Sequence, residues 1–184
     1  MDVSLIIIIA VALFVVFGIL QYNKLIRLNV RVDEAFAQIE VELKRRADLI
    51  PNLVETVKGY ASHEKEALEK VVQARAASTT ASTLPAVAAA DGALTNALRG
   101  LLAVAEAYPD LKASTNFLQL QEELSTTENK VSFARQFYND NVRTLNTAVK
   151  TIPTSFFTGF AKVDEREFYE VEDPTIRNAP NVKF

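Results

Sequence analysis

Residues 3–20 form an unbroken apolar segment near the start of the chain and read VSLIIIIAVALFVVFGIL. Ser4 and Gly18 are the only positions in it that are not Val, Leu, Ile, Phe or Ala. As a helix, a segment of this length rises about 27 Å, close to the roughly 30 Å hydrocarbon core of a bilayer. The sequence therefore predicts a transmembrane helix, and residues 1–23 are interpreted as an N-terminal membrane anchor.

A cleaved signal peptide is the competing interpretation of this segment. Signal peptides begin with basic residues and end at a cleavage site of small residues. Here Asp2 precedes the apolar residues, and no A-x-A pattern follows them. These flanks favour an anchor that is not removed.

The residues that follow the anchor predict its orientation. Lys24, Arg27 and Arg31 come directly after the apolar segment, whereas no Lys or Arg precedes it. The positive-inside rule then places the N-terminus outside and the body of the chain in the cytoplasm. Tyr22 is suited to the membrane–water interface, so Tyr22, Lys24 and Arg27 are the predicted interface residues.

The composition excludes several classes of function. The chain has no Cys, which removes disulfides, thiolate metal sites and cysteine nucleophiles. Its net charge of −3 lacks the basic footprint of a nucleic-acid partner. His63 is the single histidine, so metal motifs with two histidines cannot form, and glycine-rich phosphate loops and nucleophilic-serine motifs are also missing. We therefore expect no enzymatic activity, no cofactor and no metal site.

Residues 24–153 have the periodicity of a cytoplasmic bundle of long helices. Apolar residues recur at steps of three and four over residues 24–77, which predicts one long helix. Pro51 lies inside this pattern and is expected either to kink the helix or to mark a reversal of the chain. Helices are also predicted over residues 86–107 and 116–151, after a loop of small polar residues at 78–85. The last helix carries a heptad seam, typical of coiled-coil packing.

Residues 154–184 are rich in aromatic side chains and also contain Pro174 and Pro180. We interpret Glu167–Val171 as a short strand or a last helical turn, and the remainder as an extended tail on the bundle. The predicted fold is all-α, with one transmembrane helix continuing into an antiparallel bundle of three or four long helices and a short extended C-terminal tail. A continuous helix at Pro51 implies three helices and a tail far from the membrane, whereas a reversal there implies four and returns the tail to the bilayer.

The densest group of cations is Lys44, Arg45 and Arg46. One interpretation is that these residues bind lipid phosphate or an acidic partner. The other is that they pair with nearby carboxylates such as Glu40 and Asp48 on a solvated helix face. Pairing three or four residues apart favours the second interpretation.

Two further groups are candidate interaction sites. The run that contains Asp48, Pro51 and Asn52 is either a partner site at a break in a rigid helix or a kink that only fits the bundle. Three phenylalanines of the tail either enter a bilayer or a partner groove, or pack into the core, and core packing is favoured. They are Phe156, Phe157 and Phe160.

The chain resembles the LemA family over nearly its whole length, through long motifs in the first helix and in the later helices. The matching motifs are Tyr22-Asn23, Arg31–Ala35, Leu43–Val54, Val57–Tyr60, Leu101–Lys112, Asn116-Phe117, Leu120–Leu124, Thr127–Asn129, Ala134–Asp140, Ala179-Pro180 and Phe184. Residues 78–83 and 154–160 look particular to this chain. The resemblance implies a single-pass bacterial membrane protein with a helical bundle and no assigned enzymatic activity. With the orientation predicted above, we expect it in the bacterial inner (cytoplasmic) membrane. It also implies loose links to membrane remodelling, to organelle biogenesis, or to membrane metalloproteases encoded nearby.

The leading hypothesis is a membrane-anchored helical scaffold of the bacterial envelope that self-associates, with the lipid bilayer and further copies of itself as partners. Two features favour self-association. The heptad seam of the helix predicted over residues 116–151 is longer than the helix over 86–107 can cover, and an anchor confines the chain to a membrane, which raises its effective concentration. The alternative is a monomeric adaptor or regulator of another membrane protein, such as a protease.

Overall fold

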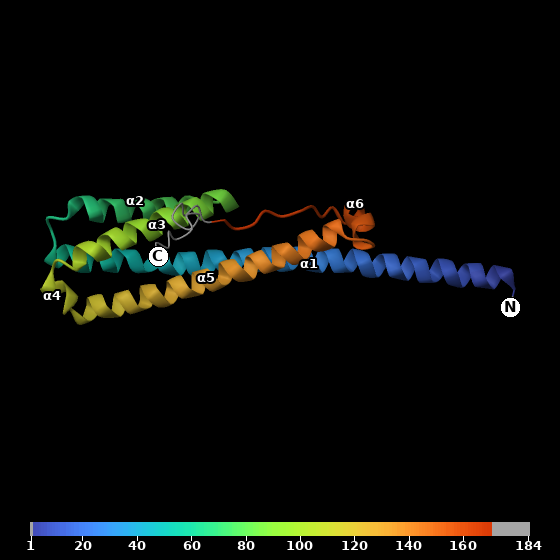
Figure 1. Cartoon of the computed structure of the whole chain (residues 1–184), viewed down its shortest axis with the longest axis horizontal. Coiled ribbons are helices and arrows are strands. Elements are labelled where there is room, and N and C mark those ends of the chain that lie inside the picture. The colour runs from blue at the N-terminus through green and yellow to red at the C-terminus, as the bar shows by residue number, and fades with distance from the viewer. Residues whose placement is uncertain (1, 171–184) are drawn as a thin grey trace, which may run out of the picture. The chain divides into compact units, whose positions relative to one another are not determined.

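The structure is a computed structural model that describes residues 2–170, and this part of the chain is helical with no β-strand (Figure 1). The helices are α1 (Val3–Tyr60), α2 (Lys65–Thr80), α3 (Leu84–Ala105), α4 (Pro109–Lys112), α5 (Thr115–Lys150), the 3-10 helix η1 (Thr154–Phe157) and α6 (Thr158–Ala161). The prediction of an all-α chain with a long apolar N-terminal helix is confirmed.

α1 is a single helix of 58 residues that includes the apolar segment, the amphipathic stripe and Pro51. The structure therefore has no chain reversal at Pro51. It divides the helix expected over residues 24–77, because α1 ends at Tyr60 and α2 begins at Lys65. Gly59 weakens the helix just before this turn, since glycine is the poorest helix former after proline.

The described residues form two compact units, which are considered one at a time. Unit 1 comprises Met1–Gln38 and Ala134–Phe168. Unit 2 comprises Ile39–Phe133 and Tyr169–Phe184, and its description ends at residue 170.

Unit 2 has one hydrophobic core cluster to which α1, α2, α3, α4 and α5 all contribute. α2 and α3 are packed against each other and run antiparallel, because only residues 81–83 connect them. Four of these helices contribute fully buried members to the cluster, and α5 contributes the nearly buried Phe117 and Leu124. The fully buried members are Ile50, Leu53 and Val57 of α1, Val71 of α2, Leu101 of α3 and Leu111 of α4.

The stretch expected to be a loop at residues 78–85 is mostly helical in the structure. Ser78, Thr79 and Thr80 complete α2, and their hydroxyl groups donate to backbone carbonyls three or four residues earlier. Such bonds let small polar residues remain inside a helix. Thr83 is the N-cap of α3, and its Oγ1 accepts from the backbone amide of Ala86 at 3.4 Å.

The seam of α5 is covered inside the same chain. Most of its side chains are buried, in unit 2 for the first half of the helix and in unit 1 for the second half. The buried members are Phe117, Leu124, Thr127, Val131, Ala134, Tyr138, Leu145 and Ala148. The seam therefore does not by itself require a second copy of the chain.

In unit 1, Arg166 connects the segment after α6 to α1 and α5 by hydrogen bonds and an ion pair. Its backbone amide donates to Oδ1 of Asn146 at 2.9 Å, and the Asn146 amide group donates back to the carbonyl of Arg166 at 2.9 Å. Its guanidinium group bonds Asn29 at 3.3 Å and pairs with Asp33 on α1. Residues 163–170 are nevertheless neither helix nor strand. The element expected at Glu167–Val171 is thus not formed by residues 167–170, and Val171 lies outside the described residues.

Tyr138 is buried in unit 1 between α1 and this segment. Its ring lies 5.9 Å from that of Phe36 between centroids, and its hydroxyl group donates to the carbonyl of Glu167 at 2.9 Å. Burial is the main cause that raises the pKa of Tyr138 above the ordinary value of 10.0. The negative charges of Glu167 and Asp33 also raise this pKa, whereas the positive charge of Arg166 lowers it. The folded chain therefore prefers the neutral phenol.

We expect the free energy of unfolding to fall as the pH rises above about 10, because folding raises the pKa of Tyr138. The stabilisation is complete below the pKa of the unfolded chain and is lost as the pH rises through the folded pKa. Urea denaturation in detergent at neutral and alkaline pH measures this slope. Tyr138→Phe should reduce the slope, and its effect at neutral pH reports the lost hydroxyl bond separately. An alkaline slope unchanged by the substitution would contradict the assignment.

Candidate functional site

The apolar part of α1 is exposed over residues 3–17, and the described part of the chain covers it only near its end. Its most apolar window has a mean hydropathy of 3.3, and none of that window is buried. Within residues 2–170, α1 is the one helix long and apolar enough to cross a membrane. A core helix of similar composition would be covered by other elements, whereas a lipid-facing helix needs no protein cover. The chain is thus compatible with a single-pass membrane protein.

Residues 152–160, here named the aromatic turn, lie against the end of the apolar segment within unit 1. Phe157 meets Phe17 edge to face, with ring centroids 6.3 Å apart. It also lies over Gly18, where an added Cβ would stand 3.3 Å from Cε1 of Phe157. Thr154 donates from its hydroxyl group to Oε1 of Gln21 at 3.4 Å. The turn therefore contacts α1 on both sides of the boundary between apolar and polar residues.

The three phenylalanines of the aromatic turn have different surroundings. Phe157 is half-buried against α1, whereas Phe156 and Phe160 expose 68% and 80% of their surface. Ile152 is exposed as well. From the sequence, the tail was expected to return to the membrane segment only if the chain reversed at Pro51. In the structure the reversal occurs at residues 61–64, and it has the same consequence.

The predicted interface residues of α1 are all exposed. Tyr22, Lys24 and Arg27 lie on the first turns after the apolar segment, and Arg31 follows one turn later. Nε of Arg27 donates to the backbone carbonyl of Asn23 at 3.2 Å. None of these side chains is buried by the described part of the chain.

The cation cluster is divided by the fold, and the expectation of one solvated face is wrong for Arg46. Lys44 is exposed and pairs with Asp48 at 2.9 Å, and Arg45 is exposed too. Arg46 has only 1% of its surface exposed and lies in the core of unit 2. The i,i+4 pairing thus describes Lys44, whereas Arg46, on the same helix, pairs with carboxylates of other helices.

Arg46 is the centre of a buried polar cluster. Its guanidinium group pairs with the carboxylates of Asp91 on α3 and Glu128 on α5, and donates to Oγ1 of Thr95 at 3.1 Å. Tyr169 completes the cluster, because its hydroxyl group donates to Oδ2 of Asp91 at 2.8 Å. The cluster links three helices and residue 169 by charged and polar bonds rather than by apolar packing.

The spacing of apolar residues in the sequence indicates that Arg46 is buried, although a solvated face was predicted for it. Arg46 stands in a series of residues at intervals of seven, in which every other member is apolar. The members are Leu25, Val32, Ile39, Arg46 and Leu53, and all are buried. Asp91 likewise takes a place in the buried stripe of α3, between Val87 and Leu94. A cation and a carboxylate at two such core positions indicate an internal ion pair.

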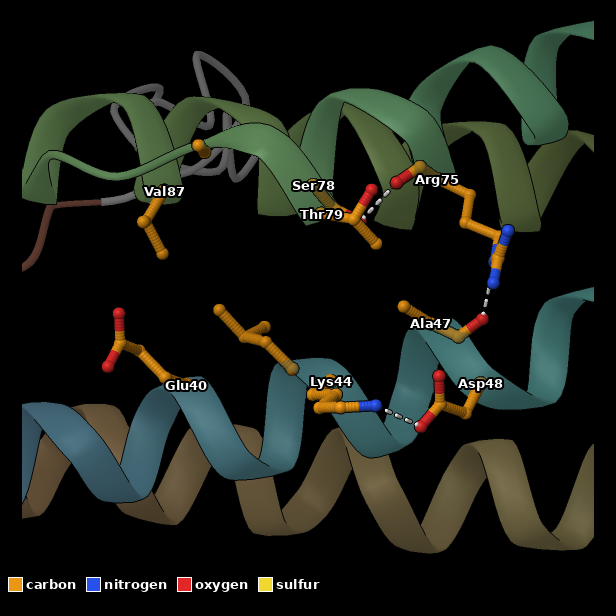
Figure 2. Close-up of a pocket in the computed structure, with 10 residues that line it drawn as sticks. Glu40, Lys44, Ala47, Asp48, Arg75, Ser78, Thr79 and Val87 are labelled. Carbon is orange, nitrogen blue, oxygen red and sulfur yellow. Dashed lines mark hydrogen bonds and ion pairs between the residues drawn. The ribbon is translucent and has the colours of Figure 1, made fainter.

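Pro51 leaves a backbone carbonyl of α1 available for a contact with α2 inside unit 2. Proline has no backbone N–H, so the carbonyl of Ala47 lacks its usual donor four residues later. Nε of Arg75 on α2 donates to that carbonyl at 2.8 Å (Figure 2). Asn52, next to the proline, is exposed. Pro51 therefore creates an acceptor through which α2 is attached to α1.

A groove of about 580 Å³ lies beside this contact, between α1 and the adjacent ends of α2 and α3 (Figure 2). Its lining is mixed in character: Glu40, Lys44 and Asp48 are charged, and Ser78 and Thr79 carry hydroxyl groups. Within residues 2–170, no group of three or more His, Asp or Glu side chains is placed to hold a metal ion. Leu43, Ala47, Ala81 and Val87 are apolar members of the lining, so the groove offers apolar as well as polar contacts to another molecule.

Comparison with known proteins gives matches over most of the chain. The model of the LemA family matches residues 35–184. Protein LemA of Metamycoplasma hominis is 26% identical over 165 residues, which cover 85% of this chain and 75% of that protein. Magnetosome protein MamQ of Magnetospirillum gryphiswaldense is 23% identical, over 82% of this chain and 66% of the relative. Magnetosome protein MamQ 2 of Paramagnetospirillum magneticum is 24% identical, over 85% and 68%. The resemblance found in the sequence is thereby confirmed, and the chain belongs to the LemA family.

Proposed function

We propose that this chain is a non-enzymatic, membrane-anchored scaffold of the bacterial envelope that acts in membrane organisation. The observation that carries the proposal is α1, a single helix whose uncovered apolar part continues into residues that form the protein core. Because one helix serves as anchor and as core element, a rotation or clustering of the anchor is transmitted to the body. The exposed Lys24, Arg27 and Arg31 support an orientation with the N-terminus outside and the body in the cytoplasm.

Self-association is the second part of the proposal. The seam of α5 no longer supports it, since that seam is covered within one chain. Support comes from the anchor, which confines copies to two dimensions and raises their effective concentration. Phe133 and Phe137 add to it, because they lie one turn apart on α5 and are both exposed. Exposed aromatic groups of this kind are enriched in protein interfaces.

The test uses the full chain in lipid nanodiscs and in vesicles. Native mass spectrometry should show dimers or larger species. Because the chain has no Cys, Phe133→Cys introduces a single thiol whose disulfide cross-linking should be efficient. Ser125→Cys on the same helix is the matched control and should cross-link weakly. Monomers alone in both measurements would refute self-association, and failure of the chain to float with vesicles would refute anchoring.

The groove beside Arg75 favours one alternative function, a monomeric adaptor for another membrane protein. Its charged and hydroxyl-bearing lining suits a polar segment of a partner. An adaptor should purify from its native membrane as one copy with one stoichiometric partner. Thr79→Arg would fill the groove and should release that partner. Thr126→Arg, at an exposed position of α5, should not release it. Equal retention by both variants would exclude the groove as the binding site.

A further inference from the structure

We propose that the aromatic turn is a second membrane contact, in which Phe156 and Phe160 enter the hydrocarbon edge of the bilayer that α1 crosses. The inference rests on the proposed anchoring by α1 and adds a lipid-binding surface to it. The partner is the acyl-chain region directly beneath the headgroups. Both phenylalanines would then be buried in lipid rather than exposed to water.

The position of the turn along α1 gives its depth. Phe157 contacts Gly18, which comes two residues before the end of the apolar segment at Leu20. A helix rises about 1.5 Å per residue, so this contact lies about 3 Å inside the apolar segment. Thr154 bonds Gln21, the first polar residue after that segment. The turn therefore spans the level at which hydrocarbon gives way to headgroups.

The exposed side chains of the turn match this level chemically. Ile152, Phe156 and Phe160 are large, apolar and mostly exposed, and they belong to a segment that packs directly on a membrane-spanning helix. Isolated exposed apolar residues are common on proteins, but a group of them marks an interaction site. Here Phe157 of the turn packs on Phe17 and Gly18 of the apolar segment, so the bilayer proposed to surround that segment is the partner within reach of the turn.

Charged residues frame the turn on both sides. Lys150 precedes it, pairing with Glu165 at 2.7 Å, and Lys162 follows it at the end of α6. Lys24 lies on α1, three residues after the Gln21 to which the turn is bonded. Ammonium groups on flexible stems reach the headgroup region while their alkyl chains lie along apolar surface. Because Lys150 is paired with Glu165, the exposed Lys24 and Lys162 are the cations that match headgroups beside the apolar turn.

Fluorescence of single tryptophans tests the inference, because the native chain contains no Trp. Phe156→Trp and Phe160→Trp report on the turn, and Phe14→Trp reports on the anchor. Phe133→Trp is the matched control, since Phe133 on α5 is 71% exposed and lies outside the turn. The full-length variants are placed in vesicles of phosphatidylcholine and phosphatidylglycerol whose acyl chains are brominated either near the headgroup or near the terminal methyl. Flotation and circular dichroism confirm that each variant is inserted and folded.

The inference predicts blue-shifted emission for Phe156→Trp and Phe160→Trp, with several-fold stronger quenching than Phe133→Trp by bromine near the headgroup. Phe14→Trp should be quenched more by the deeper bromine. Quenching of the turn no stronger than that of Phe133→Trp would overturn the inference while anchoring stands. Blue-shifted emission without quenching would also overturn it, in favour of coverage by a second copy. An unquenched Phe14→Trp in chains that do not float would refute the anchoring itself.

Discussion

Arg46→Ala is expected to lower the free energy of unfolding by about 3–5 kcal/mol, because it leaves buried carboxylate charge without its cation. Asp91 is as deeply buried as Arg46, and its carboxylate would lose the guanidinium group that pairs with it while keeping the hydroxyl group of Tyr169. The carboxylate of Glu128 is part-exposed and can turn to water, so Asp91 carries most of the loss. For a chain of this size, the midpoint of thermal unfolding should fall by roughly 10 °C.

Urea or thermal denaturation of the full chain in detergent, followed by circular dichroism, measures this effect. Lys44→Ala is the matched control, since Lys44 forms an exposed pair with Asp48 that should contribute at most about 1 kcal/mol. Replacing the buried pair by apolar residues, as in Arg46→Met with Asp91→Leu, should recover most of the stability that Arg46→Ala removes. A loss below about 1 kcal/mol for Arg46→Ala would show that the buried ion pair is not formed.

Arg75→Met is expected to lower the free energy of unfolding by about 1–3 kcal/mol, because it removes the charged donor to the carbonyl of Ala47. The methionine side chain retains an apolar stem against α1. The cost depends on Pro51, which supplies no amide for that carbonyl. When Pro51→Ala restores the backbone donor, the same change at Arg75 should cost little. The two positions should therefore be coupled by roughly 1–2 kcal/mol.

A double-mutant cycle of Arg75→Met and Pro51→Ala, followed by urea denaturation in detergent, measures this coupling. Lys70→Met is the control on the same helix, because Lys70 pairs with Glu66 at an exposed site. Its effect on the free energy of unfolding should be the same in the native chain and in the Pro51→Ala variant. Additive effects of Arg75→Met and Pro51→Ala would mean that the Ala47 carbonyl does not connect the two residues.

Periodicity and composition predicted the long helices α1, α3 and α5, but they did not separate α2 from α1 and did not predict the short helices α4, η1 and α6. The apolar segment predicts α1, and the patterns over residues 86–107 and 116–151 predict α3 and α5 to within two residues at each end. Such patterns are reliable because burial of one helix face is required whatever its partner is. The limits of α1 and α2 were not predicted, because proline is the stronger helix breaker by propensity, and yet α1 continues through Pro51 and ends just after Gly59.

The interaction residues were harder to predict, because their roles depend on contacts between distant parts of the chain. Lys44 and Arg46 are two residues apart and chemically similar, yet one is exposed and the other is buried. Only the presence of Asp91 at a facing core position makes burial of Arg46 tolerable. A heptad count would have placed Arg46 on the core face, but it would not have identified its partners.

The sequence by itself determined the long apolar N-terminal helix, the helical class and the lack of cysteine, because each follows from local composition and spacing. The tertiary structure decided where the chain reverses, which cation is buried and what lies beside the end of the anchor. The physical reason is that these outcomes depend on pairing between residues far apart in the sequence. Phe157 meets Gly18, and Arg75 meets Ala47, only because the fold brings their helices or segments together.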